Sequence, residues 1–267
     1  MHEEPVVQGL DTSRPNIARV YDYWLGGKEN FAADRDLAEK MLSIYPGIAA
    51  MYRDNRKFVT RAVTWAAGQG ITRFLDLGAG LPTHPAVHET ARHVIPDARV
   101  AYVDNDPLVV MHAGALLAKG AAGDVTAVRA DLTDPAAVLA HPDVATVTSG
   151  DAPVCVILAA VLHFYDAPTA REIAAGYVAQ MTPGSVMVVS CGHTDDAVLS
   201  DKAQEGYTAA TWRNHSRDDI VSFFAGLEIV PPGLAQAHAW RGGMTEQPDK
   251  PAGPAYVLGG VATKPGG

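Results

Sequence analysis

The chain has 267 residues, of which 48% are hydrophobic and 19% charged, the composition of a globular protein with room for a large core. Its formal net charge of −9 works against general attraction to phosphate backbones, so we expect no nucleic-acid partner. No apolar stretch approaches the roughly 20 residues of a membrane-spanning helix, and the N-terminus lacks a signal-peptide layout, so we expect no membrane association and a cytoplasmic location.

The first predicted elements are helices. The first ten residues are expected to be disordered or loosely attached. A helix then begins near Ser13, a capping residue followed by Pro15 in the first turn, and ends at Gly26 and Gly27. Two more helices are predicted over residues 34–44 and 48–67. We therefore expect an N-terminal helical cap of residues 1–70 before a second domain of residues 71–267.

Residues 73–82 read RFLDLGAGLP, an apolar strand that ends near an acid and turns through two glycines. Gly78 and Gly80, on either side of Ala79, allow a sharp turn and close approach of the backbone to a ligand. A dinucleotide site would have a third glycine where Thr83 stands, and Asp76 in front of the loop would repel pyrophosphate. The charges favour S-adenosylmethionine, which carries an ammonium and a sulfonium, over NAD. An ordinary strand–turn–helix is the alternative.

The next two predicted strands also lead into acidic residues. Asp104 can accept hydrogen bonds from a ribose diol, and the adjacent Asn105 is a ligand contact or a turn residue. Asp106, before a proline, reads as a helix N-cap. Asp131 can accept from the adenine amino group or form an Asx turn, while Leu132 offers a backbone N–H and an apolar face.

The chain alternates between strands and helices after residue 70, which predicts an α/β fold with a doubly wound, Rossmann-like parallel sheet. Strands are expected at residues 73–77, 99–104, 125–129, 154–158 and 185–191. Helices are expected at residues 85–94, 107–118, 135–141, 169–181, 195–206 and 217–225. Residues 255–262 are a candidate edge strand, after a Pro/Gly-rich stretch at 231–254. Cys155 and Cys191 fall in buried strands as reduced thiols, and no zinc-site spacing occurs.

The order of these signals resembles the class I S-adenosylmethionine-dependent methyltransferases over about residues 72–191. The match includes VCVILAAVLHFYDAP at the fourth strand and the P-G that precedes the fifth. The resemblance implies that Asp76 and the loop backbone hold the methionine end, Asp104 the ribose, and Asp131 with Leu132 the adenine, with Ala159 and Ala160 beside the methionine portion. It also implies an antiparallel last strand. Pro82 departs from the third glycine of many members and removes a backbone donor.

The N-terminal segment carries a narrower resemblance. DTSRPNIARVYDYWLGGKENFAADRDLAEK and MYRDNRKFVTRAV resemble an actinobacterial family of S-adenosylmethionine methyltransferase-like proteins with undefined substrate. This extends the match to nearly the whole chain.

The first helix has a second stripe formed by Asn16, Arg19 and Tyr23, which either faces the cofactor cleft or is solvated. Tyr21 and Tyr23 are candidates for the wall around the sulfonium, since aromatic faces attract cations, although Tyr21 also fits a core role. Four arginines are candidate anchors for a substrate carboxylate or partners of surface acids: Arg14, Arg53, Arg56 and Arg61.

The sequence thus predicts a methyltransferase that uses S-adenosylmethionine to methylate a small molecule held under a helical cap. His163 is the candidate general base if the acceptor is a hydroxyl, and otherwise a packed or capping residue. The alternatives are a non-catalytic S-adenosylmethionine-binding or regulatory protein and, less favoured, an NAD-dependent oxidoreductase. The sequence fixes neither the acceptor nor the oligomeric state.

Overall fold

The computed structural model describes residues 10–117, 124–242 and 253–266. The expected disorder of the first ten residues concerns a segment that lies, up to residue 9, outside the described residues. The described strands form one sheet in the order β3-β2-β1-β4-β5-β8-β6, with β7 pairing with β8. Their bounds are β1 Arg73–Leu77, β2 Arg99–Asp104, β3 Val125–Arg129, β4 Cys155–Ala159, β5 Val186–Thr194, β6 Glu228–Ile229, β7 Ala235–Gln236 and β8 Ala255–Thr263.

The strand pairing confirms the predicted doubly wound architecture. Strands β1 to β5 pair with one another in parallel, and the order reverses between β1 and β4. Strand β8 is antiparallel to β5, as the resemblance implied. It is not an edge strand, however, because the short β6 pairs with its other side. Buried strands with covered faces explain the near-continuous apolar runs in the sequence.

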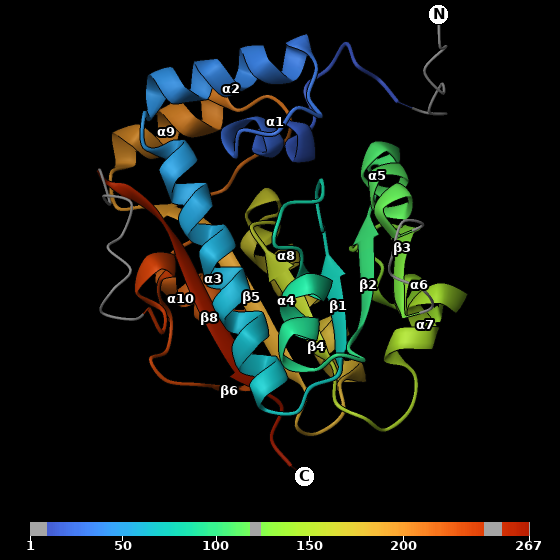
Figure 1. The fold of residues 1–267 in the computed structure, drawn as a ribbon. Helices are drawn as coiled ribbons and strands as arrows, with labels where there is room; N and C mark the ends of the chain where they lie inside the picture. The colour runs from blue at the N-terminus through green and yellow to red at the C-terminus, as the bar shows by residue number, and fades with distance from the viewer. Residues whose placement is uncertain (1–9, 118–123, 243–252, 267) are drawn as a thin grey trace, which may run out of the picture.

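Helices cover both faces of the sheet (Figure 1). Helices α3 (Ile48–Gly68) and α4 (Val87–Val94) pack on one face, where Phe74 and Ile157 belong to their core cluster. Helices α7 (Pro142–Thr148), α8 (Ala167–Gln180) and α10 (Arg217–Ser222) pack on the other, around Leu75 and Leu77. The remaining helices of this part are α5 (Pro107–Leu117) and α6 (Pro135–Ala140). Helix α7 was not predicted. The expected helix at residues 135–141 corresponds to α6 and ends directly before α7.

A smaller group of helices lies above the carboxyl ends of the strands, at the top of Figure 1. It comprises α1 (Ile17–Trp24), α2 (Ala32–Ile44) and α9 (Ala197–Gly206), which share one apolar cluster. The predicted cap of residues 1–70 therefore divides in space, because α3 packs on the sheet while α1 and α2 lie over its mouth. Helix α9 joins them from a distant part of the sequence.

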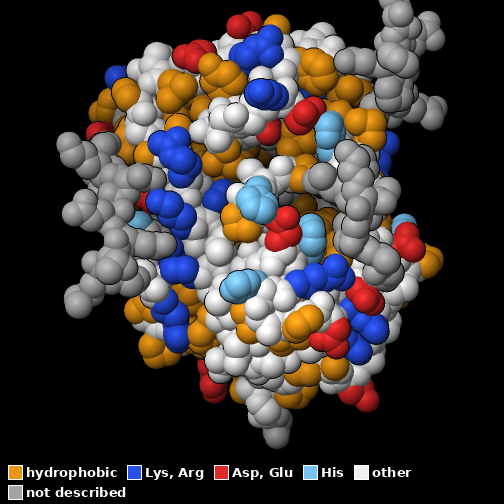
Figure 2. Space-filling model, viewed as in Figure 1, with side chains coloured by type: hydrophobic (Ala, Val, Ile, Leu, Met, Phe, Trp, Pro, Cys, Tyr) orange, Lys and Arg blue, Asp and Glu red, His pale blue; other side chains and the backbone are white. Residues whose placement is uncertain are grey.

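One side of the surface carries a row of basic side chains (Figure 2), although the net charge of the chain is −9. Figure 2 shows Lys and Arg side chains in a row on the side where α3 lies in Figure 1. The Lys and Arg residues of α3 are Arg53, Arg56, Lys57 and Arg61. Within the described residues, no helix has the length and apolarity that a membrane crossing requires.

Candidate functional site

A cavity opens at the carboxyl ends of β1, β2 and β4, beneath α1. This is the point where the strand order reverses, the usual ligand position in open α/β sheets. Most of the predicted site residues line it: Tyr21, Asp76, Gly78, Ala79, Gly80, Asp104, Asn105, Leu132, Ala159 and Ala160. The sheet topology therefore brings together residues that lie up to about 140 positions apart in the sequence.

The glycine loop after β1 has the backbone conformation that the sequence suggested. Gly78 and Gly80 have φ angles of 68° and 65°, in the left-handed region that favours glycine. A Cβ at Gly78 would lie 2.4 Å from Cγ1 of Val161, so the loop and the end of β4 approach each other closely there. The N–H groups of Gly78 and Ala79 both donate to the carbonyl of Val103, which fixes the turn against β2. The loop is thus pinned between two neighbouring strands.

Asp104 at the end of β2 organises the loop from the other side. Its Oδ2 accepts from the N–H of Gly80 at 2.9 Å, and its Oδ1 accepts from the N–H of Asp106 at 2.9 Å. Burial raises the pKa of this carboxyl. A carboxylate has about four lone-pair positions, so two hydrogen bonds leave room for donors from a ligand.

Asp76 is a buried acid with a cation nearby. It is 6% exposed, and burial raises its pKa to about 6, an effect that the Arg56 guanidinium partly offsets. Both residues line the cavity. A carboxylate and a guanidinium side by side can pair with the ammonium and the carboxylate of an amino acid, respectively. Arg56 was one of four candidate anchors, and only the packing of α3 on the sheet distinguishes it.

The end of β4 is linked to the cap by a chain of hydrogen bonds. Ala160 has a φ of 58°, an uncommon value for a non-glycine residue, and its N–H donates to the carbonyl and Oγ of Ser190. The Ser190 hydroxyl donates to Oδ1 of Asn55 at 2.7 Å, and Nδ2 of Asn55 donates to the Tyr21 hydroxyl at 3.1 Å. Tyr21 lines the cavity and is held there by this chain of hydrogen bonds.

The two residues predicted to contact the adenine, Asp131 and Leu132, differ in position. Leu132 lines the cavity, whereas Asp131 is exposed and is not part of the lining. Oδ1 of Asp131 accepts from the N–H and the hydroxyl of Thr133, at 2.9 and 2.8 Å. This is the Asx turn that the sequence left open, and it directs that oxygen toward its own loop.

His163 does not reach the cavity. Its side chain is fully buried in a short 3₁₀ turn, its Nδ1 accepts from the N–H of Gly192 at 3.1 Å, and its Nε2 has no partner among the described residues. Burial lowers its pKa to about 3. The ring packs against Phe164 at 4.4 Å. The structure favours the packed histidine over the general base.

Two further candidates, Arg14 and Tyr23, do not line the cavity. The Arg14 side chain is 87% exposed and pairs with Asp11. Tyr23 is absent from the described lining, and its hydroxyl donates to Glu39 on α2. The polar stripe of α1 therefore does not face the cleft as a unit: Asn16 lines the cavity, whereas Arg19 and Tyr23 contact Asp34 and Glu39 on α2.

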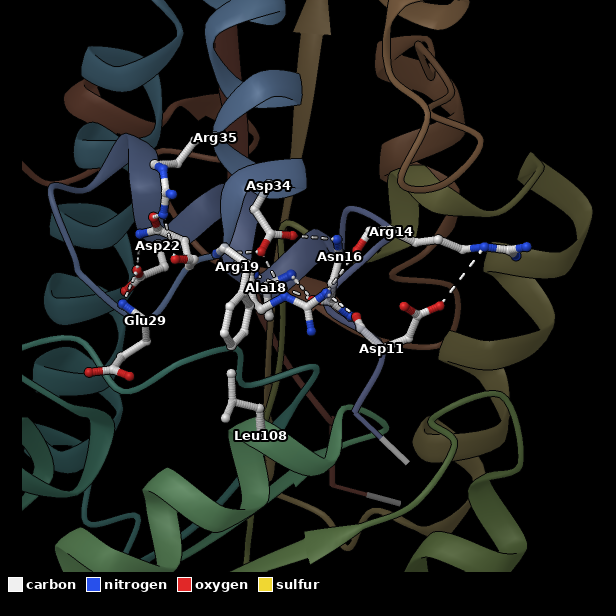
Figure 3. Close-up of polar contacts among 12 residues, drawn as sticks. Asp11, Arg14, Asn16, Ala18, Arg19, Asp22, Glu29, Asp34, Arg35 and Leu108 are labelled. Carbon is white, nitrogen blue, oxygen red and sulfur yellow. Dashed lines mark hydrogen bonds and ion pairs between the residues drawn. The ribbon is translucent and has the colours of Figure 1, made fainter. Parts of the chain in front are cut away.

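Arg19 has a different role from the one expected. It is 3% exposed and joins α1 to α2 and to the start of α5; Figure 3 shows its contact with Asp34. Its Nε donates to Oδ2 of Asp34 on α2 at 2.9 Å, and its Nη1 lies 3.6 Å from Oδ2 of Asp106 at the start of α5. Since Asp106 is bonded to Asp104, this ion-pair cluster connects the cap to the strand-end acid.

Asp22 is a cavity-lining acid that the sequence reading missed. It is 6% exposed, and burial raises its pKa. Oδ2 accepts from the N–H of Glu29 and from Nδ2 of Asn30, at 3.0 and 2.9 Å, which orders the connection from α1 to α2 (Figure 3). A Cβ at Gly27 would lie 1.9 Å from Oδ1 of Asp22, so a larger residue there would displace this carboxylate. Gly26 and Gly27, directly after the helix, were the sequence feature that could have indicated close packing at this acid.

The other candidate arginines do not line the cavity. Arg61 donates to the carbonyls of Trp240 and Ala237, which holds the segment before residue 243 against α3. Arg53 is exposed. Among the described residues, no group of three or more His, Cys, Asp or Glu side chains could hold a metal ion.

Comparison with known families gives a match over almost the whole chain. The model of a family described as S-adenosyl methyltransferase matches residues 3–265. No curated protein matches the chain.

Solved structures agree with this match. A candidate methyltransferase from Thermobifida fusca YX is 35% identical with a TM-score of 0.87, covering 97% of this chain and 98% of that one. A DUF574 family protein from Streptomyces avermitilis is 34% identical with a TM-score of 0.87, covering 96% and 99%. An O-methyltransferase family protein from Burkholderia thailandensis, 17% identical with a TM-score of 0.52 over 82% and 60% of the two chains, shares the fold.

Proposed function

The chain belongs to the S-adenosyl methyltransferase family, and from that premise we propose that it transfers a methyl group from S-adenosylmethionine to a small-molecule acceptor bound beneath α1. The observation that carries the proposal is the juxtaposition of Asp76 and Arg56 beside the glycine loop. A carboxylate and a guanidinium at this position suit the ammonium and carboxylate of the cofactor's amino-acid end better than they suit a pyrophosphate.

The cavity residues fit the other parts of the cofactor as well. We assign Asp104 to the ribose hydroxyls, because its carboxylate is fixed by two backbone N–H groups and keeps accepting capacity. Leu132 and Ala130 offer apolar contact to the adenine ring, with Asn105 at the same end. Gly78 and Ala79 lie beside the methionine portion, where a side chain at position 78 would collide with Val161.

The bound cofactor would supply an electrophilic methyl group on its sulfonium. The chain's own contribution is to hold two reactants in line and to exclude water. Tyr21 and Phe164 contribute aromatic surfaces to the cavity, and Tyr21 is held by Asn55. Aromatic faces attract a positive charge, which suits a position near the sulfonium. His163 has no part in this proposal.

A thermal-shift and turnover experiment tests the function. S-adenosylhomocysteine should raise the melting temperature, and NAD at the same concentration should not. A rise with NAD alone would refute the proposal. A screen of small-molecule acceptors with S-adenosylmethionine then distinguishes the enzyme from the non-catalytic binding protein, since only the enzyme forms S-adenosylhomocysteine in an acceptor-dependent way.

A further inference from the structure

The lining of the cofactor cavity has an excess of negative charge. Among the described residues, its acids are Asp22, Asp76 and Asp104, and its base is Arg56. S-adenosylmethionine carries a sulfonium, an ammonium and a carboxylate, so it brings one net positive charge. With all of these groups ionised, one carboxylate of the lining remains without a cation when the cofactor is bound.

The carboxylate that remains is that of Asp22 on α1. Asp76 lies beside Arg56, and these two residues are assigned to the amino-acid end of the cofactor. Asp104 is fixed by two backbone N–H groups and is assigned to the ribose. Asp22 is 6% exposed and has no part in either assignment. A buried carboxylate needs a partner of its own, because burial without one is costly.

One carboxylate oxygen of Asp22 is available to a ligand. Oδ2 accepts from the N–H of Glu29 and from Nδ2 of Asn30, which holds the side chain in place (Figure 3). Oδ1 accepts from none of the described residues and is not sealed inside the packing. The charged groups that act on this carboxyl are Glu29 and His112, which pair with each other outside the cavity lining. An ammonium group in the cavity would supply the missing cation.

Asp22 lies in the roof of the cavity, opposite the strand ends that are assigned to the cofactor. Ala18, Tyr21, Asp22 and Leu25 line the cavity at positions i, i+3, i+4 and i+7 of α1, which is one face of a helix. Figure 1 shows α1 above the carboxyl ends of the strands. An acceptor between α1 and the cofactor would therefore meet Asp22 on its side away from the strands.

Much of the surface around Asp22 is apolar or aromatic. Ile17 and Leu25 contribute aliphatic surface from α1, and Phe164 and Tyr165 contribute rings from the segment after β4. An apolar wall with one carboxylate recognises a ligand that combines an apolar body with a positive charge. A neutral acceptor of the same shape would leave the charge of Asp22 uncompensated.

We propose that Asp22 binds the methyl acceptor, and that the acceptor is an amine on an apolar skeleton. This rests on the proposed function, since it identifies the class of molecule that the cofactor methylates. Burial raises the pKa of Asp22, which makes its carboxylate a stronger base toward an ammonium group.

The methyl transfer then balances as follows. The ammonium of the acceptor passes a proton to the Asp22 carboxylate, and from there the proton passes to water. The nitrogen lone pair bonds to the methyl carbon as the carbon–sulfur bond breaks. The bonding electron pair stays on sulfur, which becomes a thioether. The positive charge moves to the methylated nitrogen, beside the carboxylate of Asp22.

Phenethylamine and 2-phenylethanol test the proposal, because they share a skeleton and differ only in carrying an ammonium or a hydroxyl group. Their affinities are measured by calorimetry at about pH 8, where the amine is protonated, with saturating S-adenosylhomocysteine. We expect the wild type to bind phenethylamine at least tenfold more tightly than 2-phenylethanol. Asp22→Asn should weaken phenethylamine binding at least tenfold. It should change the affinities for 2-phenylethanol and S-adenosylhomocysteine less than threefold, which shows that the cavity is intact.

Glu29→Gln is the matched control. It removes one negative charge close to Asp22, but the Glu29 side chain is 51% exposed, pairs with His112 and lies outside the cavity lining. This variant should keep the preference for the amine. Mass spectrometry should detect N-methylphenethylamine after incubation of the wild type with S-adenosylmethionine and phenethylamine, and Asp22→Asn should lower kcat/KM at least tenfold.

Four results would overturn the proposal: equal affinities of the wild type for the two compounds, equal losses of both in Asp22→Asn, the same loss in Glu29→Gln, or no methylated product. A loss of S-adenosylhomocysteine affinity in Asp22→Asn as large as that for phenethylamine would make Asp22 a cofactor contact, and would also overturn it. Failure of the proposed function is distinguishable, because the wild type would then not bind S-adenosylhomocysteine.

Discussion

The acids at the strand ends differ in their surroundings, and this difference has a measurable consequence. Asp104→Ala removes an acceptor that both fixes Gly80 and faces the cavity, so we expect the affinity for S-adenosylhomocysteine to fall at least thirtyfold. That is about 2 kcal/mol, within the range for a hydrogen bond to a charged group. Asp131→Ala is the matched control, because Asp131 is exposed and bonded within its own turn. We expect it to change the affinity less than threefold by calorimetry. Equal losses in the two variants would place Asp131 in the site.

We expect Asp76 to make cofactor binding depend on pH. Its pKa near 6 in the free protein is raised by burial, so below pH 6 the carboxyl is mainly protonated and must lose its proton to pair with an ammonium. The affinity should therefore fall by up to tenfold for each pH unit below 6 and be level above about pH 7. Asp76→Asn should bind more weakly at pH 7 and show no such slope between pH 5 and 7. A slope that persists in Asp76→Asn would assign the titration to another group.

At the level of the elements, one buried arginine joins α1 to α2 and to the start of α5. Arg19→Met leaves Asp34 and Asp106, which are 0% and 5% exposed, without their cation. Breaking a buried ion pair in this way costs about 3–5 kcal/mol, and we expect that loss in the free energy of unfolding measured in urea.

Arg14→Met is the control for this experiment, because its ion pair with Asp11 is exposed. A surface pair is worth at most about 1 kcal/mol, so we expect a small effect. If both variants lost the same stability, the ion-pair cluster would not be what holds the cap.

For the whole molecule, the cap and the sheet should unfold together. Asn55 bonds to Ser190 on β5, and Phe58 of α3 packs so closely on β8 that a Cβ at Gly259 would lie 2.7 Å from its ring. We expect tryptophan fluorescence and far-UV circular dichroism to report one coincident transition in urea, as for a single cooperative unit. Trp24 belongs to the cap cluster and Trp240 to the sheet's core, so the fluorescence covers both regions. Two separate transitions would favour the predicted boundary near residue 70 as an independent domain border.

Local sequence patterns were sufficient for the five parallel strands and for the glycine loop with its strand-end acids. An apolar run that ends at a glycine or an acid specifies both a buried strand and its carboxyl end, so Asp76, Gly78 and Asp104 were predicted from short segments. Parallel strands place their carboxyl ends on one edge of the sheet, which made the grouping of these residues predictable as well.

Side-chain direction could not be predicted in the same way. The sequence has a histidine after β4 and polar residues along α1, but only the packing shows that His163 is enclosed and that Tyr23 faces Glu39. Arg56 and Asp22 enter the cavity because α3 lies on the sheet and α1 crosses its mouth. These positions depend on rotation of a helix about its axis, which distant contacts determine.

The sequence by itself determined the α/β order, the glycine loop and the strand-end acids, because each depends on neighbouring residues and on backbone geometry. Only the tertiary structure decided the placing of Asp76 and Arg56 on one cavity, the burial of Arg19 and the apolar cluster of the cap. The buried members of that cluster range from Val20 on α1 to Tyr207 after α9. Contacts over such separations arise from the packing of whole helices, which no local pattern encodes.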